Sequence, residues 1–315
     1  MNPIAGLAAR ILENVRRVII GKAETAELLV TSLIAGGHVL LEDVPGTGKT
    51  MLAKSLARSL DCAFARIQFT PDLLPADITG TSVYNLQDGM FHFQPGPVFT
   101  NVLLADEINR ATPRTQAALL ECMEEKQVTE SGVTRPLGAP FIVVATQNPV
   151  EIQGTFPLPE AQLDRFLMRL TPGYPSTGEA AAMLDRFITE SPLEALAPVA
   201  GHEAIVEAQR TYMRAHVSQP VRQYIVALCE RTRGAEQVQL GASPRGMLAL
   251  LRASQALACV RDRAFVTPDD VKALAEPVLA HRIIVRGLYG QADAAKRIVR
   301  DAIAATPAPT ERPGE

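Results

Sequence analysis

Five short apolar runs before residue 171 limit the folds that are open to this 315-residue chain. They are Val39–Leu41, Phe64–Phe69, Val102–Ala105, Phe141–Thr146 and Phe166–Leu170. The middle runs are continuous rather than alternating, which is typical of strands buried on both faces of a sheet. Apolar residues recur at helical spacing between several of the runs. Strands that alternate with helices predict an α/β domain with a mostly parallel, five-stranded sheet.

The sequence changes in character after Leu170. Residues 171–175 read Thr-Pro-Gly-Tyr-Pro, which is typical of a linker. Beyond it, Val221, Ile225 and Leu228 share one helical face, and Thr267 followed by Pro268 is a helix start signal. We therefore predict an α/β core over residues 1–171, a smaller all-α domain over 172–305 and a Pro-rich, disordered tail over 306–315.

Two segments interrupt the strand–helix alternation of the core. Residues 82–94 carry Asp88-Gly89 between two stretches rich in aromatic and apolar residues, and residues 127–137 turn at Ser131-Gly132. Asp-Gly in that setting is a hairpin signal. We expect both segments to be hairpin insertions that do not complete the sheet.

Composition excludes several classes of protein. Hydrophobic residues make up 47% of the chain, too many for a disordered protein, yet no apolar run approaches the roughly 18 residues that a membrane span needs. The four cysteines lie far apart, as expected of reduced thiols in a cytoplasmic protein, and residues 1–17 do not form a secretory signal. The net charge of −3 gives no electrostatic reason to expect nucleic acid binding.

The strongest functional signal is a Gly-rich segment between the first apolar run and a helix. Its glycines, Gly46 and Gly48, let successive backbone N–H groups converge on a phosphate, and the helix start adds its positive dipole end. Lys49 can reach the β- and γ-phosphates, and the Thr50 hydroxyl can ligate Mg²⁺. The usual pattern opens with Gly, but Asp43 stands there in this chain. The residues expected to bind nucleotide are Val44, Pro45, Gly46, Thr47, Gly48, Lys49, Thr50 and Met51.

Polar residues at the ends of two later apolar runs indicate hydrolysis of the nucleotide. Asp106 and Glu107 follow Val102–Ala105 directly. We expect Asp106 to join the Mg²⁺ ligands and Glu107 to orient and deprotonate the attacking water. Asn148 follows Phe141–Thr146 and could hydrogen-bond the γ-phosphate or the water. On its own, an Asn-Pro pair after a strand is more often a turn.

Together these features resemble the AAA+ ATPases, and the finer motifs resemble the MoxR family within them. The resemblance covers roughly residues 4–303, and an acidic residue is common in that family where Asp43 stands. The two hairpins resemble those of the branch with a helix-2 insert and a pre-sensor-1 hairpin. The motifs that carry the resemblance are Leu41–Thr50, Asp106–Arg110, Ala145–Pro149, Leu158–Phe166 and Gly241–Gly246.

The resemblance implies roles for several basic residues. Arg165 matches the arginine finger, which acts in trans on the γ-phosphate held by a neighbouring subunit and stabilises transition-state charge. Arg110 is the alternative finger. Arg245 matches the sensor-2 arginine of the lid, and whether it acts in cis or in trans stays open. Gly21 and Lys22 match the segment that lines the adenine pocket.

The function that the resemblance implies is Mg²⁺-dependent ATP hydrolysis by an oligomeric ring, expected to be a hexamer, with residues 171–175 as a hinge to the lid. Such rings remodel or mature client proteins, often with a partner that contains a von Willebrand A domain. The alternatives are the ATPase subunit of a metal chelatase, a DNA motor and a nucleotide-binding scaffold with slow turnover. The 127–137 hairpin lacks a basic cluster, which argues against the DNA motor. Glu107 argues against the scaffold.

Overall fold

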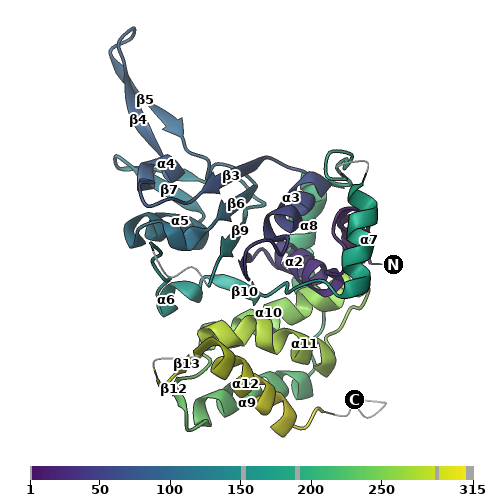
Figure 1. The fold of residues 1–315 in the computed structure, drawn as a ribbon. Helices are drawn as coiled ribbons and strands as arrows, with labels where there is room; N and C mark the ends of the chain where they lie inside the picture. Colours follow the sequence, from purple (N-terminus) through teal and green to yellow (C-terminus); the bar gives the residue numbers. More distant parts are fainter. Residues whose placement is uncertain (1, 150–153, 189–191, 288–290, 310–315) are drawn as a thin grey trace.

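A five-stranded parallel sheet forms the centre of the computed structural model, which describes residues 2–149, 154–188, 192–287 and 291–309 (Figure 1). In spatial order its strands are β10 (Phe166–Leu170), β1 (His38–Glu42), β9 (Ile142–Gln147), β6 (Val102–Asp106) and β3 (Phe64–Gln68). The predicted α/β class and all five predicted strands are confirmed. Every pairing is parallel, so the carboxyl ends of the strands share one edge.

Both faces of the sheet are covered, which explains the continuous apolar runs. In β1, Val39 and Leu41 join a hydrophobic cluster with one helical layer, whereas Leu40 joins a second cluster on the opposite face. The helices of the first layer are α1 (Pro3–Arg16), α2 (Ala23–Ala35) and α3 (Lys49–Ser59). The second face packs against α5 (Pro113–Glu125). Strand residues therefore alternate between two buried environments, and neither face needs polar side chains.

The chain returns to the core before it forms the lid. Helix α7 (Thr177–Phe187) is tied to the end of α1 by Arg186, whose Nη1 donates to two backbone carbonyls there. Helix α8 (His202–Thr211) packs on α2, and Gln209 donates to the carbonyl of Leu33 at 2.7 Å. The helical lid below them consists of α9 (Gln219–Gly234), α10 (Pro244–Val260), α11 (Pro268–Leu279) and α12 (Gln291–Ala305) (Figure 1).

Several short elements complete the described chain. In the lid, β12 (Val238–Leu240) pairs with β13 (Ile284–Val285), although the sequence predicts helices alone there. Strands this short are not visible as a periodicity.

Residues 310–315 of the predicted disordered tail lie outside the described residues. Within the described ranges, no helix combines the length and hydropathy needed to cross a membrane. The remaining elements are β2 (Leu60–Asp61), α4 (Pro75–Thr79), η1 (Ile108–Arg110), α6 (Glu160–Leu163), β11 (Ala200–Gly201), η2 (Tyr212–Arg214) and η3 (Ala280–Arg282).

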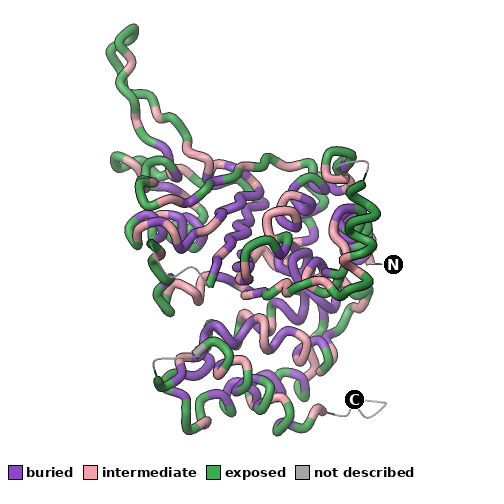
Figure 2. The backbone as a smooth tube through the Cα atoms, viewed as in Figure 1, coloured by how far each residue is buried: buried purple, intermediate pink, exposed green. Residues whose placement is uncertain are grey.

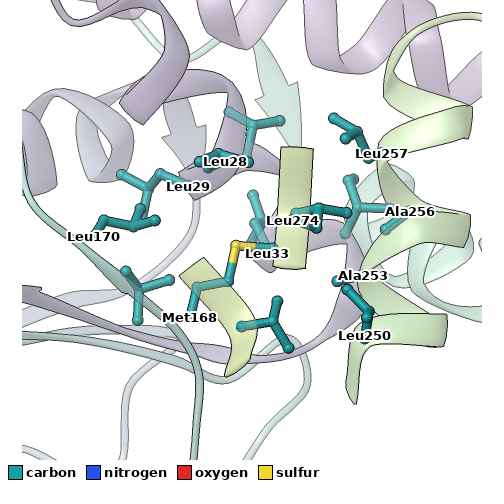
Figure 3. Packing of buried hydrophobic residues seen from close by; sticks show 14 of the residues in the cluster. Leu28, Leu29, Leu33, Met168, Leu170, Leu250, Ala253, Ala256, Leu257 and Leu274 are labelled. Atoms are coloured by element: carbon teal, nitrogen blue, oxygen red, sulfur yellow. The ribbon is translucent and has the colours of Figure 1, made fainter. Parts of the chain in front are cut away.

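The core and the lid share one hydrophobic cluster (Figure 3). From the core, α2 contributes Leu28 and Leu33, and β10 contributes Met168. From the lid, Leu250 of α10 and Leu274 of α11 are completely buried against them. The lid therefore rests on the first helical layer through close apolar packing and not only through the connecting chain.

Two antiparallel hairpins extend from the core without joining its sheet. One pairs β4 (Gly80–Asn85) with β5 (Met90–Pro95) and projects far from the body, where its tip is exposed (Figure 2). The other pairs β7 (Gln127–Glu130) with β8 (Val133–Pro136). The hairpins touch where Ser82 donates to Glu130 at 2.8 Å and Arg135 lies 3.8 Å from the centre of the Phe93 ring.

His38, at the start of β1, is a buried histidine held in one neutral form. The Val143 N–H donates to Nδ1 at 2.9 Å, and Nε2 lies 3.1 Å from the Met123 carbonyl, so Nε2 carries the proton. Burial, above all, lowers the pKa of His38 from 6.5 to about 4. A second proton would have to bind Nδ1, where the N–H of Val143 already donates, so two donors would face each other.

Acid should therefore destabilise the fold. Between pH 6.5 and 4 the unfolded chain binds a proton at His38 and the folded chain does not, so the free energy of unfolding falls as the pH falls. We expect a loss of about 2 kcal/mol from His38 between pH 7.5 and pH 5, measured by urea denaturation. His38→Gln should reduce this pH dependence. Equal slopes for the two proteins would contradict the assignment.

Candidate functional site

The phosphate loop lies at the carboxyl edge of the sheet, between β1 and α3. Gly46 and Gly48 have φ angles of 82° and 88°, and a Cβ at either would meet no atom within 4 Å. Backbone conformation rather than crowding therefore calls for glycine. Gly48 is the N-cap of α3 and makes no side-chain hydrogen bond to the first turn. The N–H groups of that turn therefore remain available to a ligand at the loop. This is the arrangement that binds phosphate at a helix start.

Lys49, the first residue of α3, curls back over the loop. Its Nζ donates to the carbonyls of Val44 and Gln147, both at 3.2 Å, and to that of Asp43. Burial lowers the pKa of Lys49, and the carboxylates of Asp43 and Asp106 oppose this effect. The ammonium lies at the junction of the loop and β9, within the cavity that also holds the acidic residues.

Asp106, at the end of β6, lies next to Thr50. The Thr50 hydroxyl lies 3.4 Å from both carboxylate oxygens, and Thr146 donates to Oδ1 at 2.6 Å. Arg66 of β3 binds Oδ2 through Nη2 at 2.8 Å. A hydroxyl and a carboxylate are oxygen ligands of the kind Mg²⁺ prefers, so this pair fits the ion. Within the described ranges, no group of three or more His, Cys, Asp or Glu is arranged to hold a metal. Phosphate oxygens and waters would complete the shell of an ion bound by Thr50 and Asp106.

Glu107 follows in a left-handed conformation with φ 57°. Its N–H donates to the Thr146 hydroxyl at 2.8 Å. Its carboxylate accepts from Gln68 at 2.9 Å, and the Arg110 Nε lies 3.1 Å from the same oxygen. A non-glycine residue at positive φ is uncommon and costs roughly 1–3 kcal/mol, so the surroundings must hold it there. Arg110, the alternative arginine finger, thus lies beside Glu107 of its own subunit.

One cavity of about 410 Å³ collects these groups. Asn148, buried after β9, closes it, and its own carbonyl accepts from Asn109 at 3.2 Å. Sequence reasoning missed Arg66, Gln68 and Thr146, which also line it. Arg66 and Gln68 were visible only as polar residues in an otherwise apolar run. The cavity is lined by Pro45, Gly46, Gly48, Lys49, Thr50, Met51, Arg66, Gln68, Asp106, Glu107, Thr146, Gln147 and Asn148.

A second, more apolar pocket adjoins the loop on the side of α1 and α7. Thr47 and Met51 border it together with Ile19, Ile20 and Phe187. Its apolar walls suit a flat base next to the phosphates. Gly21 lies beside this wall with φ 73°. Val44 borders neither pocket and instead accepts hydrogen bonds through its carbonyl.

The expected hinge at residues 171–175 is held by two charged side chains of the core. Lys22, which also borders the apolar pocket, donates to the carbonyls of Pro172, at 2.8 Å, and Gly173. Asp43 accepts from the Gly173 N–H at 2.5 Å and from the Val44 N–H at 2.8 Å. The acid that replaces the first glycine of the phosphate loop therefore ties that loop to the segment leading out of β10.

Arg165 and Arg245 lie together, away from the phosphate loop. Arg165 binds Glu124 of α5 at 2.8 Å, and Arg245, at the start of α10, binds the other oxygen of Glu124 at 2.5 Å. Arg245 also lies 3.6 Å from Asp164. The hydrogen bond from Arg245, above all, lowers the pKa of Glu124. Both arginines border a cavity of about 320 Å³ that shares no lining residue with the loop cavity.

Comparison with known proteins agrees with this arrangement. The "ATPase family associated with various cellular activities (AAA)" matches residues 38–168, and the AAA lid domain matches residues 230–303. YeaC of Bacillus subtilis, an uncharacterised protein, is 47% identical over 99% of this chain and 97% of its own length. The chaperone MoxR1 of Mycobacterium tuberculosis is 41% identical over 89% of this chain and 78% of its own length. A crystal structure from Cytophaga hutchinsonii, described as a candidate ATPase, has a TM-score of 0.87 and 36% identity, covering 98% of this chain and 96% of that one.

Proposed function

Because the chain belongs to the MoxR family of AAA+ ATPases, we propose that it hydrolyses ATP with Mg²⁺ and uses the energy to remodel or mature partner proteins. The observation that carries this proposal is the convergence of Lys49, Thr50, Asp106 and Glu107 on one cavity at the carboxyl edge of the sheet. Each supplies a different function needed for phosphoryl transfer to water.

The residues divide the chemistry among them. The backbone N–H groups of the loop and Lys49 bind and orient the phosphates. Thr50 and Asp106 would hold Mg²⁺, which neutralises phosphate charge when it is bound. Glu107 takes the proton of the attacking water, and Gln68 fixes the carboxylate for that task. Asn148 donates to the γ-phosphate or to the water from the next strand.

The arginine pair supports a ring. Arg165 and Arg245 are held by Glu124, outside the cavity with Lys49. We infer that both reach the nucleotide of a neighbouring subunit, in a homo-oligomer that we propose to be hexameric. A guanidinium has five donors, so a bond to Glu124 leaves others for phosphate oxygens.

The four cysteines are free thiols, which supports a cytoplasmic location.

The projecting hairpin supports a protein client rather than nucleic acid. Tyr84, Leu86, Met90 and Phe91 are at least half exposed on it. Arg135, the arginine of the second hairpin, is engaged with Phe93 and lies 3.9 Å from Glu130. Exposed apolar tips without a basic patch suit contact with a protein surface. We propose that this hairpin contacts a client protein complex of the MoxR type, with a partner that contains a von Willebrand A domain.

Replacing Lys49 with Ala should strongly reduce nucleotide turnover. The full-length protein should release phosphate from ATP only with Mg²⁺, and Lys49→Ala should lower the rate at least 100-fold because its ammonium stabilises charge on the phosphates. Lys54→Ala, on the same helix but outside the cavity, is the matched control and should keep activity. Wild-type protein with no Mg²⁺-dependent turnover, alone or with client protein, would contradict the proposed function and favour the scaffold.

A further inference from the structure

Arg169 of β10 is a largely buried cation whose hydrogen bonds are incomplete. Its side chain is only 9% exposed, and its nearest carboxylate oxygen, on Glu42, lies 3.6 Å from Nη1. Its Nη2 has no hydrogen-bond partner in the described part of the chain. A guanidinium carries five donors, and burying it without partners is costly. In folded proteins such a donor is normally satisfied by an ordered water or a bound ion.

Arg169 lines a cavity of about 440 Å³ between the core and the lid. The core side consists of the start of α2, the end of β10 and Thr171 of the linker. The lid side consists of α11 and α12, which contribute Lys272, Lys296 and Arg300. None of these residues belongs to the phosphate-loop cavity or to the apolar pocket beside it.

Three of the four cations that line the cavity lie within 4 Å of an acid: Arg169 near Glu42, as described above, and two residues of the lid. Arg300 holds Glu276 through two bonds of 2.6 and 3.1 Å, and Lys272 lies 3.3 Å from Asp269. Lys296 has only a 3.4 Å hydrogen bond to the Thr171 hydroxyl, and the described ranges give it no ion pair.

Glu24 and Glu276 are the two acids in the lining. Glu276 is engaged by Arg300, so only Glu24 would face a ligand with an unneutralised negative charge. The groups left to bind a ligand are Lys296, from the lid, and the incompletely bonded guanidinium of Arg169, from the core. Unpaired donors on both sides of the cavity favour a ligand rich in acceptors, and a small one that can keep clear of Glu24.

We propose that this cavity binds a small oxyanion, a phosphate or carboxylate group, between Arg169 and Lys296. An oxyanion supplies several acceptors at once, which a guanidinium and an ammonium can share. Its two main partners come from β10 and α12, so the bound anion stabilises the present position of the lid on the core. Thr171 lines this cavity, and the next residue, Pro172, lines the apolar nucleotide pocket. Anion binding is thereby adjacent to nucleotide binding along the linker.

Titration of the full-length protein with inorganic phosphate tests this site. All proteins carry Lys49→Ala, so that the loop lysine makes no contribution, and calorimetry is done at constant ionic strength. Lys296→Ala should weaken phosphate binding at least tenfold. Arg297→Ala is the matched control, because it removes the same charge from the next residue of α12, which is exposed and outside the cavity. It should bind phosphate like its parent.

Citrate in place of phosphate distinguishes the two anion chemistries, and binding of either one that depends on Lys296 supports the site. A folded Arg169→Gln protein should lose the same binding. If this variant does not fold, the comparison of Lys296→Ala with Arg297→Ala tests the site without it. Equal weakening by the Lys296 and Arg297 changes would show general electrostatic attraction and overturn the proposal. So would the failure of both anions to bind.

Discussion

Glu107→Gln should leave ATP binding intact and reduce the rate of hydrolysis by a factor of about 10² to 10⁴, the usual contribution of a general base. The amide has the shape of the carboxylate and its oxygen can still accept from Gln68, so the local structure should persist. The amide cannot take a proton from water. The expected result is a protein that holds ATP without turning it over, seen as normal nucleotide affinity in calorimetry and as lost phosphate release.

Glu125→Gln is the matched control for this change, because it removes an exposed acid of α5 that does not line the cavity. It should hydrolyse ATP at the wild-type rate. Turnover that stays unchanged in Glu107→Gln would remove Glu107 from the proposed role. If the variant stalls as expected, it is also a means of retaining clients, since co-purification from a state with bound ATP would identify the partners.

Arg165→Ala should bind ATP and lose at least about three powers of ten in turnover, as expected for an arginine that stabilises transition-state charge. Its side chain lies with Arg245 on Glu124 and not in the cavity of its own subunit. We therefore propose that the guanidinium removed by this change acts at the site of a neighbouring subunit. Mixing Arg165→Ala with Lys49→Ala subunits should restore part of the activity, because some interfaces then combine an intact loop with an intact arginine.

Arg110→Ala, tested in the same mixtures, separates the two candidate fingers. Arg110 lies 3.1 Å from Glu107 of its own chain, so we expect its loss not to be rescued by subunits that lack only Lys49. Rescue of Arg110→Ala but not of Arg165→Ala would reverse the assignment. Light scattering with and without ATP gives the oligomeric state, and a monomer under all conditions would contradict action in trans.

The sequence predicted most of the core because its signals are local. The strands Val102–Asp106 and Ile142–Gln147 are continuous apolar runs, since both faces of the sheet are covered. Lys49 and Thr50 follow from a loop whose pattern is set by neighbouring residues. Arg66 and Gln68 could not be predicted in this way. They reach the acids only because the register of β3 places Gln68 opposite Asp106, and one sequence does not reveal that register.

Contacts between distant segments were also beyond the sequence. The carboxylate that holds Arg245 is Glu124, 121 positions earlier, and only the tertiary fold brings the start of α10 to the end of α5. Lys22 was predicted to line the adenine pocket. It borders the apolar pocket beside the phosphate loop, yet its ammonium binds the carbonyls of the linker 150 residues away. Side chains that join separately folding segments leave no local pattern in one chain.

The hydrophobic cluster shared by Leu28, Met168, Leu250 and Leu274 has a consequence for how such a chain can evolve (Figure 3). Removing the lid would uncover the apolar side of α2 and β10, and exposing buried leucines costs about 1.5–3 kcal/mol each. The lid therefore cannot be exchanged independently of the core. A lineage that exchanged it for another would have to redesign the nucleotide-binding core at the same time, so the two halves of the chain are expected to be inherited together.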